Sequence, residues 1–510
     1  MTAPAPTRAR DRAFARKLVY LLLIAGLLMP LFLLSQPATQ GTKSAPGQPG
    51  GKLARLREQY HLSQTELGQV DPTSETIRLA TLGMRGVAED ILWWKANKFQ
   101  MKKDWTNLRA TLEQISKLQP HSIAVWRYQA WNLSYNVSVA FDDYHDKYYW
   151  VIEGIKFLER GVHYNEHEPQ LCWDMGWFIS QKIGRADESR LYRRLFKQDD
   201  QYHGARPMEL RDNWLVGQEW YQEAARRVSP RHPIKSMAPV VFYSNGPMCR
   251  FSYAEALEKE GRFEEVAARA WKEAARQWYE FGAQEIEASE DLALRLNDQE
   301  QYEETARRAA AAIDKLAPGL RTKIGQEKYA RLTPSERRAW ETPLEKRIDA
   351  QHVLVNQIGP RLEVTNEEIA RRVTGPPRRE ALALAGAARH ADEMAVYVRR
   401  ERSKVNFDYW RVRADMEQTK AALAARKAIY EADQAFHQGD LVTARAAYDR
   451  GLHGWRGLLD RYPALKDDVN TGEDLAQDIR QYEKCLAGFD LSLPKPFFLQ
   501  DVLDKYGHRR

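Results

Sequence analysis

The sequence predicts an all-α protein in which an N-terminal transmembrane helix precedes a solenoid of helical hairpins with irregular insertions. Three observations support this prediction. An uncharged apolar run lies near the N-terminus, apolar residues recur at three- and four-residue spacing through nearly all of the remaining chain, and helix-capping residues precede many periodic segments. The chain has 510 residues, of which 43% are hydrophobic, so it is too long for one compact core and has the composition of a folded protein.

The basic character of the chain is concentrated at its N-terminus. The formal net charge is +7, and residues 1–52 hold seven basic side chains against one acidic side chain, Asp11. The rest of the chain carries almost equal numbers of acidic and basic residues. Because phosphate binding requires clustered positive charge, the composition predicts no nucleic-acid partner.

Residues 18–35 are predicted to form the transmembrane helix, because residues 18–34 carry no charged or strongly polar side chain. The basic segment 1–17 predicts a cytoplasmic N-terminus and an extracytoplasmic body. A cleaved signal peptide has the same appearance. Cleavage after Ala38 would place Gln36 where a small residue is required, which favours a retained anchor.

The segment that follows the apolar run, residues 36–52, is rich in Pro, Gly, Ser and Thr and predicts a flexible linker. The body beyond it is expected to contain helical repeats in 53–318, a helical region of unclear repeat character in 319–404, and a helical region with a further hairpin in 405–510. Capping patterns that mark helix starts occur at Asp71–Pro72, at Thr333, Pro334 and Glu336, and at Thr365 and Glu368.

Four segments have the length and pattern of a helical hairpin, with small or apolar residues in two helices around a short turn. Gly261 and Gly439 stand at two of the turns, where a left-handed backbone ends the first helix, and Ala444 is expected at a helix crossing. The four segments are 89–120, 253–274, 293–318 and 428–451. Weaker pairs are expected in 123–168 and 171–200.

These segments resemble tetratricopeptide repeats, which use about 34 residues for each helix-turn-helix unit, and in particular large membrane-anchored repeat proteins of bacteria. The resemblance covers about half of the body, and residues 319–404 match no repeat. It implies a right-handed superhelix with a concave surface that binds protein partners. With the predicted anchor, it implies a single-pass protein of the bacterial inner membrane, compatible with a subunit of a larger membrane assembly. An irregular helical bundle is the alternative fold.

One string has the form of a metalloprotease motif. His163, Glu166 and His167 spell HxxEH, in which two histidines on one helical face bind zinc and the glutamate activates water. Pro169 follows closely and a helix is expected to end here, so the two histidines need not share a face. A metal-dependent hydrolase that uses residues 163–167 is nevertheless the alternative function.

An aromatic and acidic insertion occupies residues 141–150. Tyr149 and Trp150 are expected to pack inward at the start of a helix. A surface patch remains as the candidate partner-binding site, because Tyr gives a large contact area among charges. Its residues are Asp142, Asp143, Tyr144 and Asp146. Calcium binding is disfavoured because the glycine and distal glutamate of an EF-hand are missing.

Three further features complete the prediction. Cys172, Cys249 and Cys485 form no metal or redox motif, although one disulfide of undetermined pairing is compatible with them. Residues 229–249, with four prolines, are expected to be irregular and to form either a partner-binding loop or a strap along the groove. Phe497 and Phe498 are expected to cap the last helix pair.

No nucleophile elbow, Walker loop or dinucleotide-binding glycine motif is present in the sequence. The sequence therefore predicts a non-catalytic scaffold without cofactors, which mediates protein-protein interaction or assembly on the extracytoplasmic side of a membrane.

Overall fold

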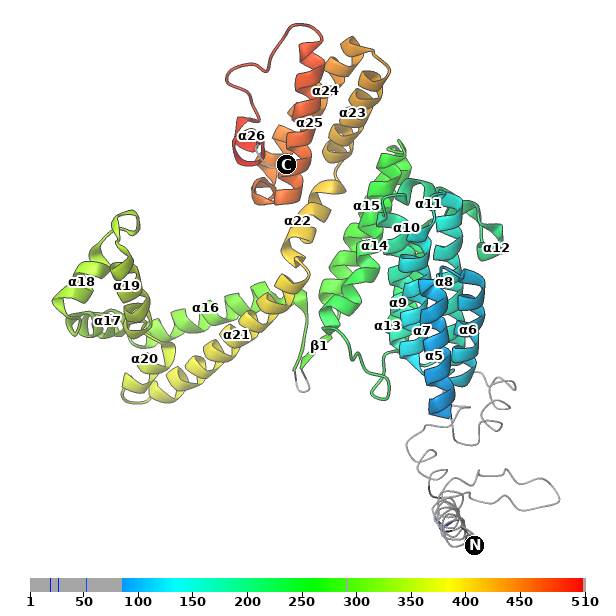
Figure 1. Cartoon of the computed structure of the whole chain (residues 1–510). Helices are drawn as coiled ribbons and strands as arrows, with labels where there is room; N and C mark the ends of the chain where they lie inside the picture. Colours follow the sequence, from blue (N-terminus) through cyan, green and yellow to red (C-terminus); the bar gives the residue numbers. More distant parts are fainter. Residues whose placement is uncertain (1–18, 20–25, 27–51, 53–84, 290–291, 508–510) are drawn as a thin grey trace, which may run out of the picture. The chain divides into compact units, whose positions relative to one another are not determined.

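The computed structural model describes Val19, Gly26 and Lys52 singly, residues 85–289 and residues 292–507 (Figure 1). These residues are almost wholly helical, with one antiparallel ribbon formed by β1 (Ile286–Ser289) and β2 (Leu292–Leu294). The prediction of an all-α body is confirmed. The described residues fall into two compact units. Unit 1 runs to Leu195 and includes Glu223–Pro233, and unit 2 comprises Phe196–Gln222 and the chain from Ile234 onward.

The predicted transmembrane helix is corrected by the structure. No helix in the described part of the chain is both long and apolar enough to cross a membrane. A span needs about 20 consecutive apolar residues, whereas the described helices are interrupted by charged side chains. The predictions of a single-pass fold class and of an inner-membrane location are therefore wrong, because both depend on this anchor. Residues 1–17 and the predicted cap Asp71–Pro72 lie outside the described residues. Of the predicted span 18–35, only Val19 and Gly26 are described, and of the predicted linker 36–52, only Lys52 is described.

Unit 1 is built from helices that pack largely in sequence order. They are α5 (Arg85–Met101), α6 (Trp105–Leu118), α7 (Ile123–Trp131), α8 (Tyr144–Tyr164), α9 (Pro169–Trp177), α10 (Ile183–Arg185) and α11 (Ser189–Gln198, to Leu195 in this unit). α7 continues into the π-helical turn η1 (Asn132–Val137) and the 3-10 turn η2 (Ser138–Ala140), and α9 continues into a second π-helical turn, η3 (Phe178–Lys182). α5 pairs with α6, α7 pairs with α8, and α9 packs on α8.

The hairpin predicted in 89–120 is confirmed as α5 and α6. Lys103 in the turn has a left-handed φ of 55°. The Asp104 carboxylate caps α6 by accepting a hydrogen bond from the Asn107 backbone N–H at 3.3 Å, which satisfies one of the unpaired donors at a helix start. Leu112 and Ile115 of α6 are buried, as the sequence predicts.

Two glycines in α8 allow its close approach to the preceding helical segment. A Cβ atom at Gly154 would lie 2.1 Å from Ser134 Oγ, and one at Gly161 would lie 2.6 Å from the Trp126 ring. Both distances are far shorter than any normal contact, so only glycine fits at these two crossings.

Unit 2 contains the remaining elements. Its α-helices are α12 (Asp200–His203), α13 (Asn213–Arg227, to Gln222 in this unit), α14 (Pro239–Lys259), α15 (Glu265–Ala283), α16 (Gln299–Leu316), α17 (Leu320–Ala330), α18 (Pro334–Glu341), α19 (Asp349–Leu362), α20 (Asn366–Arg372), α21 (Arg378–Lys404), α22 (Phe407–Glu417), α23 (Lys420–His437), α24 (Leu441–Arg461), α25 (Val469–Ala487) and α26 (Gln500–Tyr506). Its 3-10 turns are η4 (Met208–Leu210), η5 (Leu296–Asp298), η6 (Leu344–Lys346) and η7 (Pro463–Asp467). Helix pairs recur here too, and α14–α15, α16–α21 and α23–α24 are visible side by side in Figure 1.

The hairpins predicted in 253–274 and 428–451 are confirmed as α14–α15 and α23–α24. Gly261 and Gly439 adopt left-handed φ values of 77° and 80° at the two turns. Ala432 and Ala444 are fully buried where α23 crosses α24. The predicted cap at Thr333 is also present, as a complete capping box with Glu336.

The predicted irregular segment 229–249 is only partly irregular. α14 begins at Pro239 and continues through Pro247, so the apolar run Val240–Tyr243 lies in its first turns rather than in a loop or strap. Proline is favoured at the first helical position because its φ is preset and its missing N–H would be unpaired there anyway. Only residues 229–238 remain outside regular helix.

The hairpin predicted in 293–318 is wrong. Ala293 lies in β2, and α16 pairs with α21, which begins more than sixty residues after α16 ends. Arg402 of α21 holds this long-range pairing, since its guanidinium donates to the Leu296 carbonyl at 2.7 Å and to the Glu300 carboxylate at 2.9 Å. A local pattern correctly marks α16 as helical but contains no information about so distant a partner.

The C-terminal segment closes the last helices of unit 2, as the sequence predicts. Phe497 and Leu499 are buried in the core formed with α24 and α25. The Phe498 ring stacks on His453, with 4.0 Å between the ring centroids. The two phenylalanines therefore cap the helical core.

Candidate partner-binding surface

Five aromatic side chains form a connected surface on three alternate helical segments of unit 1. Trp93 lies on α5, Tyr128 and Trp131 on α7, Tyr135 on η1, and Trp177 on α9. We call these five residues the aromatic surface. Tyr128, Trp131 and Trp177 are 49%, 44% and 39% exposed, which is unusual for large rings in contact with one another.

The rings follow one another at contact distance. The ring centroids of Trp93 and Tyr128 are 5.8 Å apart, those of Tyr128 and Trp131 are 6.3 Å apart, and Trp131 stacks on Tyr135 at 6.2 Å. The Trp177 indole lies near the Tyr135 hydroxyl. Burial raises the pKa of Tyr135, and the nearby indole N–H opposes the shift without cancelling it.

Polar side chains hold the three segments in register. Gln100 of α5 and Asn132 of η1 exchange two amide hydrogen bonds, at 3.1 and 3.3 Å. Arg127 of α7 binds both carboxylate oxygens of the nearly buried Asp174 of α9. These bonds fix α5, α7 and α9 against one another, so the aromatic surface is held in one arrangement before any partner binds.

The two π-helical turns add a cation to this surface. Lys182 lies in the π-helical turn η3 and is only 9% exposed. Its ammonium lies 4.6 Å from the centre of the Tyr135 ring in η1. Burial lowers the pKa of Lys182. Within the described part of the chain, no carboxylate forms an ion pair with this ammonium. The charges of Glu188 and Asp187 act on it from nearby, and Glu188 binds Lys147 at 2.6 Å.

The sequence carries one signal for this surface. Tyr128, Trp131 and Tyr135 are spaced by three and four residues, which places them on one helical face. The contacts of Trp93 and Trp177 with these residues depend on how the helices pack, which the sequence does not specify.

The predicted partner-binding residues lie at the start of α8. Asp143 caps this helix, since its carboxylate accepts hydrogen bonds from the backbone N–H groups of His145 and Asp146 at 2.8 and 3.4 Å. Backbone N–H donation from His145 lowers the pKa of Asp143. Asp142 and Asp146 are exposed, and Tyr144 is half-buried against the His145 ring. A structural role is thus visible for Asp143, and binding by these four residues stays a prediction.

The aromatic residues that follow this cap behave differently from each other. Trp150 is buried and contacts Phe141, as expected for inward packing. Tyr149 is 48% exposed, so the prediction that it packs inward is wrong. Its hydroxyl instead accepts a hydrogen bond from Arg109 at 3.1 Å, because the turn of α8 points it along the surface of α6.

The HxxEH string lies at the end of a helix, as the sequence predicts. α8 ends at Tyr164, so His163 is in its last turn and Glu166 and His167 are in the turn that follows. All three side chains are exposed. Among the described residues, no group of three His, Cys, Asp or Glu side chains is arranged to hold a metal ion. The hydrolase alternative stays untested.

The three cysteine side chains are buried in the structure. Burial raises the pKa of the Cys172 thiol to about 12, with the Arg227 charge opposing the shift, and it also raises the pKa of Cys485. Thiols of this kind are poor nucleophiles because the reactive thiolate is scarce at neutral pH. The disulfide that the sequence permits is not formed.

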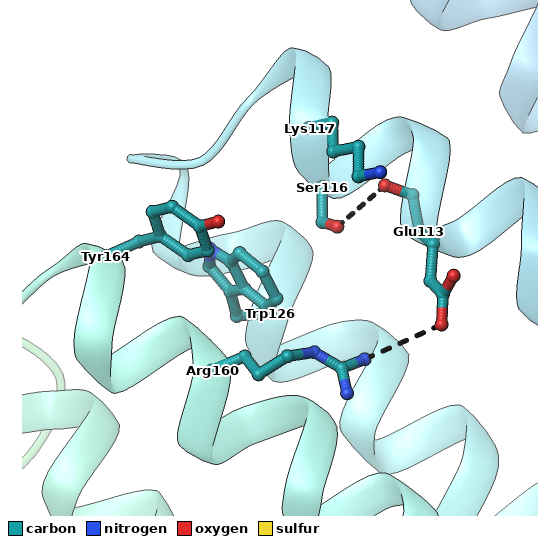
Figure 2. A pocket seen from close by; sticks show the side chains of 6 residues that line it. All are labelled: Glu113, Ser116, Lys117, Trp126, Arg160 and Tyr164. Carbon is teal, nitrogen blue, oxygen red and sulfur yellow. Dashed lines mark hydrogen bonds and ion pairs between the residues drawn. The ribbon is translucent and has the colours of Figure 1, made fainter. Parts of the chain in front are cut away.

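A pocket of about 260 Å³ lies between α6, α7 and α8 (Figure 2). The Ser116 hydroxyl donates to the Glu113 backbone carbonyl at 2.9 Å, and Arg160 lies 4.0 Å from the Glu113 carboxylate. Ser116 therefore bonds a backbone carbonyl rather than a general base, and the lining does not form the nucleophile and base pair of a hydrolase. The residues that line the pocket are Glu113, Ser116, Lys117, Trp126, Arg160 and Tyr164.

Unit 2 contains a buried charge cluster between α14, α22 and α23. The buried Glu417 carboxylate accepts hydrogen bonds from Arg426 at 2.7 Å and from Arg413 at 3.4 Å. Arg413 also donates to Glu255 at 2.7 Å, and Arg426 lies 3.5 Å from Glu258. Each arginine thus bridges two carboxylates on different helices. Such a cluster fixes how the α14–α15 hairpin docks on α22 and α23.

Tryptophan rings enclose this charge cluster. Arg426 lies 5.9 Å from the Trp271 ring centre and 5.3 Å from that of Trp455. The Trp271 indole donates to Glu258 at 2.7 Å, yet burial raises the pKa of that carboxyl to about 7. We interpret the cluster as structural, because its groups are already bonded to one another.

Comparison of the chain with protein-family models, with curated proteins and with solved structures found no match.

Proposed function

We propose that this protein is a non-catalytic helical scaffold of the tetratricopeptide type that binds a protein partner on the aromatic surface. The observation that carries the proposal is the row of half-exposed rings on α5, α7 and α9. Exposed Tyr and Trp side chains in mutual contact are characteristic of binding surfaces, because burial of each ring against a partner contributes much energy at little entropic cost.

The rigidity of the surface supports this function. The amide pair between Gln100 and Asn132 and the ion pair between Arg127 and Asp174 hold the helices that carry the rings. A preformed surface loses little conformational entropy on binding, so more of the contact energy appears as affinity. In the repeat arrangement that we propose, these alternate helical segments line the concave side, where a partner segment would bind.

Removal of exposed rings tests the proposal. The full chain carrying Trp131→Ala and Trp177→Ala is expressed in its native cells at the abundance of the wild type, partners are crosslinked, and the co-purified proteins are quantified. We expect capture to fall at least tenfold, since each lost ring removes about 2 kcal/mol of contact energy at a central position. Unchanged capture would contradict the proposal.

Two further variants sharpen this assay. Tyr279→Ala removes a 67% exposed ring from α15 of unit 2 and is the matched control, for which capture should be unchanged. Simultaneous alanine substitution of His163, Glu166 and His167 tests the hydrolase alternative. We expect this variant to capture partners normally, whereas loss of function together with loss of stoichiometric zinc would support the enzyme.

A further inference from the structure

We propose that the aromatic surface binds a peptide segment in which an acidic side chain stands among apolar residues, and that the Lys182 ammonium receives its carboxylate. This inference rests on the proposed function and names the chemistry of the partner. Its basis is the position of Lys182, a buried cation whose ammonium faces one ring of the surface.

The first step of the argument concerns the unpaired charge. Burial of a lysine is costly unless a counter-charge or hydrogen-bond acceptor compensates it. Lys182 is 9% exposed, and its pKa is lowered by burial, yet within the described residues it makes neither an ion pair nor a hydrogen bond. The Tyr135 ring, 4.6 Å away, compensates the charge only in part. A carboxylate from a partner would complete the compensation.

The second step concerns the acids near Lys182, which are Glu188 and Asp187. Glu188 is bound by Lys147 at 2.6 Å. Asp187 is exposed and forms no ion pair with Lys182 in the described part of the chain. Neither acid therefore neutralises the ammonium through a direct contact. The charge complementarity of this surface favours an acidic group and disfavours a basic one.

The third step concerns position. Tyr135 links Lys182 to the rest of the aromatic surface, because its ring stacks on Trp131 and its hydroxyl lies near the Trp177 indole. Both Tyr135 and Lys182 lie in π-helical turns, which are rare and occur frequently at functional sites. A carboxylate at Lys182 would thus stand beside apolar side chains that contact Trp131 and Trp177.

The test uses the full chain and an array of random twelve-residue peptides that are acetylated at the N-terminus and amidated at the C-terminus. We expect the wild type to select peptides enriched in Asp or Glu together with aromatic or aliphatic residues. Lys182→Met keeps the buried stem and removes the charge, so we expect it to lose the acidic preference and to bind the selected peptides at least tenfold more weakly. Lys182→Arg keeps the charge, so it should retain both the acidic preference and the affinity for the selected peptides. Lys117→Met on α6 changes the net charge equally and should bind like the wild type.

The outcomes separate this inference from the proposed function. Two outcomes would overturn the inference alone. In the first, peptide binding depends on Trp131 but the selected peptides show no acidic preference. In the second, Lys182→Met binds the selected peptides as tightly as the wild type does. If the wild type selects no peptide, the inference fails, whereas the proposed function is decided separately by partner capture with Trp131→Ala and Trp177→Ala. A parallel panel of neutral oligosaccharides tests carbohydrate as the alternative ligand of the aromatic surface. Oligosaccharide binding by the wild type that is lost in Trp131→Ala would also overturn the inference. Circular dichroism and thermal melting of each variant confirm that the fold is kept.

Discussion

Trp126 is fully buried between α7 and α8, and its indole N–H donates to the Pro120 carbonyl at 2.8 Å. Its ring stacks on Tyr164 with centroids 5.7 Å apart. Gly161 lies directly beneath this ring, where no side chain has room. The arrangement joins the two helices beside the segment that carries the aromatic surface, so single residues at this crossing control the stability of unit 1.

Substitution of Gly161 with alanine should therefore destabilise unit 1. The added Cβ would lie 2.6 Å from the Trp126 ring, and overpacking of this kind costs about 1 to 3 kcal/mol. Thermal melting measures the effect. Gly86→Ala on α5, whose new Cβ would meet no atom within 4 Å, is the control and should change stability by less than about 0.5 kcal/mol. Equal melting temperatures for the two variants would refute the assigned crossing.

A second residue-scale prediction concerns pH. Burial, together with the charges of Asp433 and Asp474, raises the pKa of Asp478 to about 8. Because the folded pKa lies above the unfolded value, the protonated acid stabilises the fold at low pH, and this contribution is lost as pH rises from about 4 through 8. Asp478→Asn should hence melt at a higher temperature than the wild type at pH 8.5, and the difference should shrink towards pH 4.

The control for this pH dependence is Asp467, whose pKa is shifted in the opposite direction. Lys505 lowers the pKa of the exposed Asp467 through a hydrogen bond of 2.7 Å. Asp467→Asn should give no gain in melting temperature at pH 8.5. A gain of equal size in both variants, or a gain for Asp478→Asn that does not depend on pH, would contradict the position assigned to Asp478.

Individual residues could be predicted from the sequence where their role is local. Gly261, Gly439, Thr333 and Asp104 occupy turns and caps whose chemistry is set by neighbouring residues. Lys182 could not be recognised, because its significance depends on burial and on the distant Tyr135. Long-range contacts of this kind are set by packing and leave no local pattern.

At the scale of elements, the α23–α24 hairpin is the clearest case of a prediction made from the sequence. Ala432 and Ala444 are fully buried at the crossing, and Asp440 caps α24 by accepting a hydrogen bond from the Thr443 backbone N–H at 3.1 Å. Small side chains allow the two helices to approach closely.

Ala444→Leu should separate these helices and destabilise unit 2 by about 1 to 3 kcal/mol, since Ala444 is fully buried at the crossing. Urea denaturation followed by circular dichroism measures the change. Val442→Leu on the same helix is the control, because Val442 is 70% exposed and a larger apolar side chain is tolerated there. Stability of Ala444→Leu within about 0.5 kcal/mol of the wild type would count against this crossing.

Two predictions at this scale were wrong, for different reasons. The pattern in 293–318 identified α16 but paired it with its sequence neighbour, whereas its partner α21 lies far along the chain. The prolines of 229–249 predicted an irregular segment, yet Pro239 occupies the first position of α14 and Pro247 is accommodated within it. Tertiary packing thus selects the partner of α16, whereas Pro239 follows a local preference for proline at a helix start.

At the scale of the whole molecule, each unit organises its polar contacts differently. In unit 1 they fix the row of helices that displays the aromatic surface. In unit 2 the charge cluster around Glu417 joins the α14–α15 hairpin to α22 and α23. The sequence predicts a helical scaffold that binds through side chains inside the superhelix and through its insertions. We propose the aromatic surface as the binding site, and only the packing of α5, α7 and α9 creates that surface.

The most direct test of the proposed function is site-specific photocrosslinking in the native cells of the protein. A benzophenone amino acid replaces Tyr128, which is 49% exposed on the aromatic surface, or Tyr279, which is 67% exposed on α15. We predict that illumination links a protein partner at position 128 and that Trp131→Ala abolishes this adduct. Adducts at position 279 with none at position 128 would contradict the claim that the aromatic surface is where the partner binds.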